Sequence, residues 1–133
     1  GAHLRNMAFY NFGVCLLQQA VQDQPVMTPE KAVWRLTGEI ADWFGTAGGK
    51  LQVGAQADIV VLDPHTLKTT PMDNYAEHPF DVMGGLRRVV NRNDGVIKAT
   101  LINGQMAFEN NQPHPALGVQ QQFGRFMARP QPA

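Results

Sequence analysis

The apolar positions in the first part of the chain recur at the spacing of an α-helix. From residue 9 to residue 21, apolar side chains return every three or four positions, which places them on one face of a helix. That stripe consists of Phe9, Phe12, Leu16, Leu17, Ala20 and Val21. Glutamines and an aspartate lie off the stripe and close the segment before Pro25. The pattern predicts an amphipathic helix that buries one face.

A second helix has a sharper beginning. The side chain of Thr28 can accept a hydrogen bond from the free amides of a first turn, and Pro29 suits the first helical position. Glu30 complements the positive end of the helix dipole. The residues expected on its buried face are Ala32, Val33 and Leu36. Residues 37–39, Thr-Gly-Glu, predict a break with a new cap, followed by a short helix that ends at Gly45.

After Gly45 the pattern becomes that of strands and loops. Residues 59–62, Ile-Val-Val-Leu, form an unbroken apolar run, which is typical of a strand covered on both faces. Residues 96–102 and 105–108 flank Asn103-Gly104, a pair that tolerates positive φ at both central positions of a type I′ turn. They predict a hairpin. Prolines and glycines interrupt residues 63–95, so we expect that stretch to be rich in loops and to contain no long element.

The predicted order of elements is that of an α+β protein, with helices first and a few strands afterwards. Three short strands make a small sheet with two unpaired edges, and such edges seek partners. A strand covered on both faces also needs layers that so short a chain hardly supplies. From Asn110 onward the chain is rich in Gln, Asn and Pro, with a short amphipathic turn expected around Phe123 and Phe126 and disorder at the end. The sequence therefore indicates part of a larger structure.

Composition narrows the class of protein. The 133 residues carry eleven basic and eleven acidic side chains, which argues against the basic surface that nucleic acid requires. No apolar run approaches the roughly 18 residues of a membrane span. The single Cys15 excludes an internal disulfide, and the first residues lack the layout of a signal peptide. We expect a cytoplasmic globular protein that binds neither nucleic acid nor membrane.

Few residues have the spacing of a catalytic or metal site. The four histidines, His3, His65, His78 and His114, show no ligand spacing, so we expect no self-contained metal site. Three of them adjoin prolines or an Asp-Pro pair and are interpreted as loop surface. Cys15 lies on the apolar helix face, where it is expected to act as a small core residue rather than a nucleophile.

Two charged features remain open to a functional interpretation. Asp58 and Asp63 flank the apolar strand, but five strand positions separate them by roughly 16 Å, too far to share a proton or a metal. We interpret them as caps of the strand ends. Residues 84–88, Gly-Gly-Leu-Arg-Arg, are either an anion-binding turn or a turn with solvated arginines.

Residues 49–58 carry the most specific pattern of the chain. Written as G-x-L-x-x-G-x-x-A-D and followed by the strand at 59–62, they resemble the C-terminal signature of the amidohydrolase superfamily. In that family the signature leads from the last barrel helix into a small β-sandwich. The helix from Thr28 resembles the T-x-E-x-A helix before it, and residues 101–104 resemble its closing V-N-G hairpin. Residues 1–5 and 84–87 are similar to stretches of N-acyl-D-amino-acid deacylases, although Met83 replaces an expected proline.

The resemblance implies a fold and an activity for a longer parent protein. Residues 1–47 would be the terminal helices of a (β/α)8 barrel, 48–108 part of a β-sandwich, and 109–133 a partly disordered arm. The parent would be a metal-dependent hydrolase of N-acyl-D-amino acids, whose metal lowers the pKa of the attacking water. Hydantoinase-like, dihydroorotase-like and imidazolonepropionase-like parents share the signature and form the alternative.

The resemblance leaves this chain without catalytic or metal-binding residues of its own. The family's metal ligands and its proton-transferring aspartate would all precede Gly1, so zinc belongs to the parent and the chain alone should not catalyse the reaction. The resemblance places only His3 and Arg5 near the active-site mouth, with Arg5 pairing with a substrate carboxylate. Alternatively, Gly1-Ala2-His3 is a cloning remnant and Arg5 is a surface residue. The expected partner is the rest of the barrel or a second copy of the chain. The chain could also be a non-catalytic assembly module that pairs its strand edges.

Overall fold

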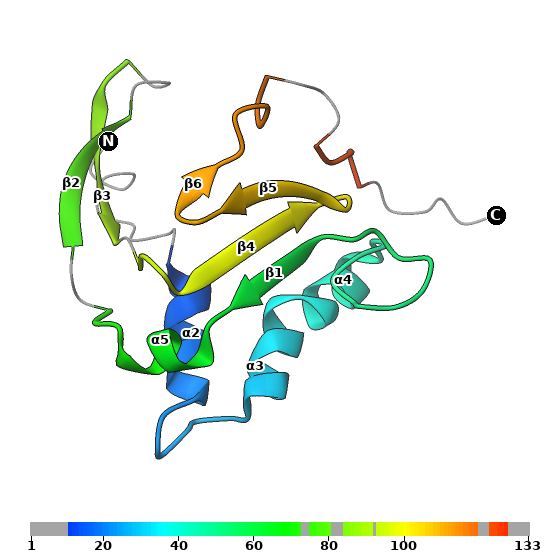
Figure 1. Cartoon of the computed structure of the whole chain (residues 1–133). Helices are drawn as coiled ribbons and strands as arrows, with labels where there is room; N and C mark the ends of the chain where they lie inside the picture. Colours follow the sequence, from blue (N-terminus) through cyan, green and yellow to red (C-terminus); the bar gives the residue numbers. More distant parts are fainter. Residues whose placement is uncertain (1–10, 73–74, 81–83, 92, 120–122, 128–133) are drawn as a thin grey trace.

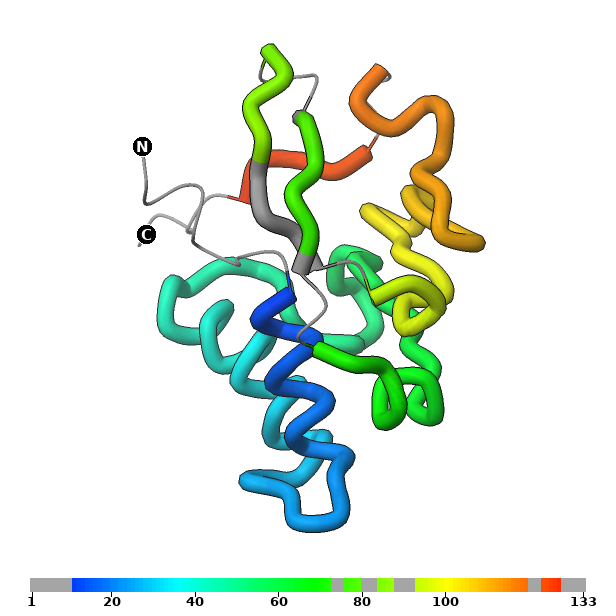
Figure 2. The backbone as a smooth tube through the Cα atoms, turned by 90° about the vertical axis from the view of Figure 1, so that its left-hand side faces the viewer, coloured from blue at the N-terminus to red at the C-terminus, as the bar shows by residue number. Residues whose placement is uncertain are grey.

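The computed structural model describes residues 11–72, 75–80, 84–91, 93–119 and 123–127. Three consecutive helices lie in the lower part of the view in Figure 1, and an antiparallel sheet lies above them. A separate two-stranded hairpin stands at the end of the molecule opposite the helices (Figure 2). The expectation of an α+β fold is confirmed at this level. No helix in the described ranges is long and apolar enough to cross a membrane.

The predicted start of a helix after Thr28 and the predicted stop at Gly45 are both confirmed. Helix α2 spans Phe12–Ala20, α3 spans Pro29–Leu36 and α4 spans Gly38–Phe44. The hydroxyl of Thr28 accepts a hydrogen bond from the amide of Lys31 at 3.2 Å. Gly45 ends α4 with φ of 65°, the left-handed conformation that suits glycine.

The junction of α3 and α4 confirms the predicted break but not the predicted cap. The hydroxyl of Thr37 donates to the carbonyl of Val33 at 2.7 Å, so it does not cap α4. The expectation that Val33 lies on the buried face is also wrong, because its side chain is 46% exposed. Ala32 is fully buried, and the next helical position is turned by about 100° from it. The buried face of α3 therefore includes fewer residues than the apolar positions of its sequence suggest.

The main sheet has four antiparallel strands in the order β1-β4-β5-β6. They are Ile59–Leu62, Ile97–Ile102, Gln105–Glu109 and Gln112–Pro113. Asn103 and Gly104 have φ of 52° and 78°, so the predicted hairpin and its turn are confirmed. A second turn, in which Asn110 and Asn111 have φ of 52° and 60°, adds the short strand β6, which the sequence analysis did not predict.

The apolar run predicted that strand β1 is covered on both faces. The described residues do not cover it in this way. Val60 is 53% exposed and Val61 is 45% exposed. Because successive strand residues point to opposite faces, both faces of β1 are open at its midpoint. The apolar run therefore correctly predicts the strand, but its covering layers are not supplied by this part of the chain.

Residues 63–95 contain no long element in their described part, as expected, but they form three short ones that the sequence did not predict. Helix α5 spans Pro64–Thr69, and strands β2 (Tyr75–Phe80) and β3 (Leu86–Asn91) form the separate hairpin. Asp63 caps α5, and Pro64 takes its first position, so the proline that suggested a loop in fact begins a helix. Gly84 and Gly85, just before β3, have φ of 64° and 77°.

The described part of the C-terminal arm runs back across the molecule. The guanidinium of Arg125 donates from Nε to the side-chain oxygen of Gln56 at 2.6 Å. Residues 124–127 have no helical structure, so the predicted amphipathic turn is wrong. Gly124 has φ of 79°, which interrupts any helical turn at that point. Residues 128–133, where we expected disorder, lie outside the described residues, and the boundaries at 47 and 108 stay predictions.

Two hydrogen bonds from the side chain of Gln18 connect helix α2 to helix α5. The amide nitrogen of Gln18 donates to the carbonyls of Leu67 and Thr70, at 2.8 and 2.7 Å, near the end of α5. Replacing Gln18 by leucine is expected to destabilise the chain by about 2 kcal/mol, because both carbonyls lose a donor in a half-buried place. Urea unfolding measures this loss. Gln19→Leu, at the exposed neighbouring position, is the matched control, and equal losses in the two variants would contradict the prediction.

Candidate functional site

The two residues predicted to bind substrate lie outside the described residues. His3 and Arg5 belong to residues 1–10, so their proximity to an active site stays a prediction.

The remaining histidines and the cysteine do not come together. His65 and His114 are exposed, and His78 and Cys15 are half-buried. His114 accepts a hydrogen bond on Nδ1 from the amide of Ala116 at 3.2 Å, which stabilises its own turn. Among the described residues no three histidine, cysteine or acidic side chains are grouped closely enough to hold a metal ion.

Asp58 caps the start of β1, as predicted, whereas the carboxylate of Asp63, at the other end of the strand, caps helix α5 instead. Asp58 accepts from the backbone amide of Asn103 at 2.8 Å and from the side-chain amide of Gln56 at 2.8 Å. These bonds attach the start of β1 to the Asn-Gly turn. Asp63, at the other end of β1, accepts the backbone amides of His65 and Thr66 at 2.9 and 3.2 Å. Both carboxylates therefore hold the main chain in place.

The hydrogen bonds to Asp63 favour its ionised form. The backbone amide and then the hydroxyl of Thr66 are the largest causes that lower its pKa from 3.8 to about 2, and Lys98 and the amide of His65 add to them. Because the pKa in the folded chain lies below the ordinary value, the stabilisation is complete above pH 3.8 and is lost as the pH falls toward 2.

The Asp63→Asn variant tests this dependence. We expect it to be less stable than the native chain near neutral pH, and the difference in midpoint of unfolding to shrink below about pH 4 and vanish near pH 2. The reason is that protonated Asp63 and asparagine carry the same charge. Urea unfolding across this pH range is the measurement, and a difference that stays constant would contradict the assignment.

For residues 84–88, the contacts of Arg87 favour solvated arginines over an anion-binding turn. Arg87 is exposed, and its Nε lies 3.4 Å from a carboxylate oxygen of Glu77 on β2. Its Nη2 donates to the backbone carbonyl of Glu77 at 3.3 Å. A guanidinium held by a carboxylate in this way is less suited to bind a free anion.

The glycines of the 49–58 pattern have structural roles. Gly49 has φ of 69°, and a Cβ placed on it would lie 2.7 Å from the carbonyl oxygen of Thr37. The loop therefore packs directly on the backbone where α3 meets α4. The leucine of the pattern, Leu51, is 81% exposed, and Val53 is fully exposed. The pattern shapes a loop whose apolar side chains find no cover among the described residues.

Large apolar side chains gather on the surface rather than in the core. Of the six buried apolar residues in the described part, four are alanines. By contrast, Ile40, Trp43 and Phe44 of α4 are 45%, 84% and 63% exposed. Their spacing of three and four places them on one side of the helix, and the rings of Trp43 and Phe44 stack with centroids 6.0 Å apart. We call these three residues the α4 apolar face.

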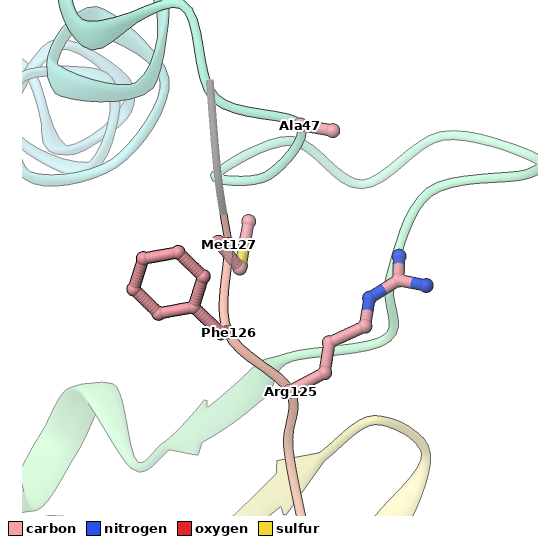
Figure 3. Close-up of a pocket in the computed structure, with 4 residues that line it drawn as sticks. All are labelled: Ala47, Arg125, Phe126 and Met127. Carbon is pink, nitrogen blue, oxygen red and sulfur yellow. The ribbon is translucent and has the colours of Figure 1, made fainter. Parts of the chain in front are cut away.

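A small hollow lies between the described C-terminal segment, residues 123–127, and the loop that follows helix α4. Ala47, Arg125, Phe126 and Met127 line it, and the volume is about 210 Å³ (Figure 3). This is smaller than the roughly 300 Å³ at which ligand pockets begin. Phe126 is 92% exposed, so the hollow adds to the apolar surface rather than forming a substrate site.

Comparison with known proteins relates the chain to longer ones. It is 49% identical over 116 residues to uncharacterised proteins of Mycobacterium bovis and Mycobacterium tuberculosis, covering 84% of this chain and 19% of each of them. It is 37% identical over 93 residues to the D-aminoacylase of Alcaligenes xylosoxydans xylosoxydans, covering 69% of this chain and 19% of that enzyme. No family model and no solved structure matches the chain. The chain thus has partial homology to a D-aminoacylase and spans about a fifth of the length of the curated relatives it matches.

Proposed function

We propose that these residues form the C-terminal part of a metal-dependent amidohydrolase that cleaves the amide bond of N-acyl-D-amino acids. The observation that carries the proposal is the 37% identity over 93 residues to a D-aminoacylase. The G-x-L-x-x-G-x-x-A-D pattern of residues 49–58 supports the same family. The proposed metal is zinc, held by residues that precede this chain.

The proposed role of this segment is to complete the scaffold. Helices α2 to α4 would be the last barrel helices, and the sheet would be part of the appended β-sandwich. The exposed α4 apolar face and Leu51 support this assignment, because large apolar side chains are normally exposed in clusters only where a partner covers them. In the complete enzyme these side chains would be buried against the rest of the polypeptide.

Hydrolysis assays on the complete polypeptide test the proposal. We expect release of the free amino acid from N-acetyl-D-methionine but not from N-acetyl-L-methionine, loss of activity with a chelator, and recovery with zinc. Hydrolysis of hydantoin or dihydroorotate alone would favour the alternative parents. The absence of any metal-dependent amide hydrolysis would overturn the proposal.

The 133-residue chain is the matched control. We expect no hydrolysis by it with or without added zinc, since the proposed ligands and catalytic groups lie elsewhere. Chelator-sensitive hydrolysis by this chain alone would overturn the assignment of its role.

Arg5 has a proposed role in the complete polypeptide, where its guanidinium would pair with the substrate carboxylate while His3 lies beside it. Arg5→Ala is expected to raise KM for N-acyl-D-amino acids by about tenfold or more, because a charge-assisted bond is lost. An unchanged KM would assign Arg5 to the surface instead.

A further inference from the structure

Asn11 stands at the start of helix α2 and is almost removed from water, with 4% of its surface exposed. Its side-chain nitrogen finds no hydrogen-bond acceptor within the part of the chain that the structure describes. The side chain does not cap α2 either, although asparagine is among the residues best suited to do so. A buried donor without an acceptor destabilises a folded chain. We therefore expect a group from outside these residues to accept its hydrogen bond.

The first turn of α2 offers further donors at the same place. The amide of Cys15 donates to the carbonyl of Asn11 at 2.9 Å and makes the first bond of the helix. The amides of residues 12–14 precede that bond and have no acceptor inside the helix. They lie at the positive end of the helix dipole, and the first turn contains no acidic side chain. Because Asn11 directly precedes this turn, its nitrogen belongs to the same end of the helix. The arrangement favours an acceptor with a negative charge.

Gly13, in the middle of this turn, is not required by the packing of the described residues. A Cβ placed on it would lie 3.8 Å from Cδ1 of Leu36, which is an ordinary contact distance. Glycine inside a helix is less stable than alanine. A residue without a side chain does, however, allow a ligand to approach the backbone closely. Asn11 and Gly13 thus both lower the stability of the chain alone, and both suit a bound ligand.

We infer that Asn11 and the first turn of α2 bind the carboxylate of the N-acyl-D-amino acid. The inference rests on the proposed function, in which α2 is a helix of the barrel. The active site of such a barrel lies at the C-terminal ends of its strands, and the helix that follows a strand begins at that face. The carboxylate is the anionic group of this substrate. Because a carboxylate accepts about four hydrogen bonds, this role does not compete with the one proposed for Arg5.

A compound without the carboxylate tests the contact in the complete polypeptide. We expect Asn11→Leu to raise KM for N-acetyl-D-methionine by about tenfold, because a bond to a charged group is lost. KM for N-acetyl-D-methioninamide, which carries a neutral amide in place of the carboxylate, should change by less than about threefold. Gln19→Leu, at an exposed position further along α2, is the control and should leave both constants unchanged. An equal change for the two compounds, or no change for either, would overturn the inference and leave the proposed function intact.

Stability separates this role from a purely structural one. In the 133-residue chain, we expect Asn11→Leu and Gly13→Ala to raise the midpoint of urea unfolding or leave it unchanged, because each removes a feature that lowers stability. In the complete polypeptide, Gly13→Ala is expected to raise KM for N-acetyl-D-methionine by about threefold or more, since its methyl group hinders approach to the backbone. Lower midpoints for both variants, with KM unchanged, would assign both residues to the fold and overturn the inference.

Binding can also be followed without catalysis. In the complete polypeptide, labelled at asparagine nitrogen and kept with a chelator so that the compound stays intact, we expect N-acetyl-D-methionine to shift the NMR signal of the Asn11 side-chain amide. N-acetyl-D-methioninamide should shift it less. A shift in a polypeptide that shows no hydrolysis in the presence of zinc would support the inference and overturn the proposed function. Hydrolysis without a shift would do the reverse, and the absence of both would overturn both.

Discussion

Replacing Gly49 by alanine will destabilise the chain by about 3 kcal/mol or more. A Cβ at this position would lie 2.7 Å from the carbonyl oxygen and 2.8 Å from the carbonyl carbon of Thr37. Both are backbone atoms at the α3–α4 junction, so they cannot turn aside as a flexible side chain does. The φ of 69° adds a conformational cost for any residue with a side chain. Urea unfolding gives the loss directly.

The second glycine of the same pattern is the matched control. Gly54 also has a positive φ, 86°, but a Cβ there would meet nothing within 4 Å. Gly54→Ala should therefore cost only about 1 kcal/mol, the price of the backbone conformation. If both variants lost the same amount, the close contact with Thr37 would not be the reason for glycine at position 49.

We expect the isolated 133-residue chain to self-associate, and we expect substitution of Trp43 and Phe44 together by glutamine to weaken that association by about tenfold or more. The two side chains are 84% and 63% exposed, so contacts between copies are expected to bury apolar surface there. The free energy of unfolding should change by less than about 1 kcal/mol, since little of either side chain is buried within the chain. Sedimentation velocity measures the first quantity and urea unfolding the second.

Val119→Gln is the control for this double substitution. Val119 is 80% exposed and lies after β6, in a segment separate from α4. We expect it to change association little. Equal effects of the two changes would show that association is unspecific, and a large loss of stability in the double variant would show that the α4 apolar face is already packed within the chain.

The roles of candidate site residues could be predicted where they depend only on neighbouring residues in the sequence. Asp58 stands at the start of an apolar run, and its bond to the amide of Asn103 follows from that position. The same signal was available for α5, because Asp63-Pro64 is also a helix start. Interpreting Pro64 as an interruption hides this start. The β2–β3 hairpin was missed for a similar reason, since Gly84 and Gly85 suggested a loop rather than the approach to a strand.

The exposure of the large apolar residues was not predictable from the pattern. The apolar sequence of β1 is the same whether residues of this chain or other residues bury its side chains. Val33 follows Ala32 directly, and the buried face of their helix is too narrow to include both. Periodicity shows that a side chain needs cover, but it does not show which atoms supply it.

The sequence by itself determined the local elements: the helix starting at Pro29, the stop at Gly45 and the Asn103-Gly104 turn, because each depends on the conformational preference of neighbouring residues. Among the described residues, only the tertiary structure decided that four of the six buried apolar side chains are alanines while Trp43 and Phe44 lie exposed, and that β1 stands at an edge of the main sheet. These depend on contacts between residues far apart in the chain, and such contacts are not encoded in any one stretch of it.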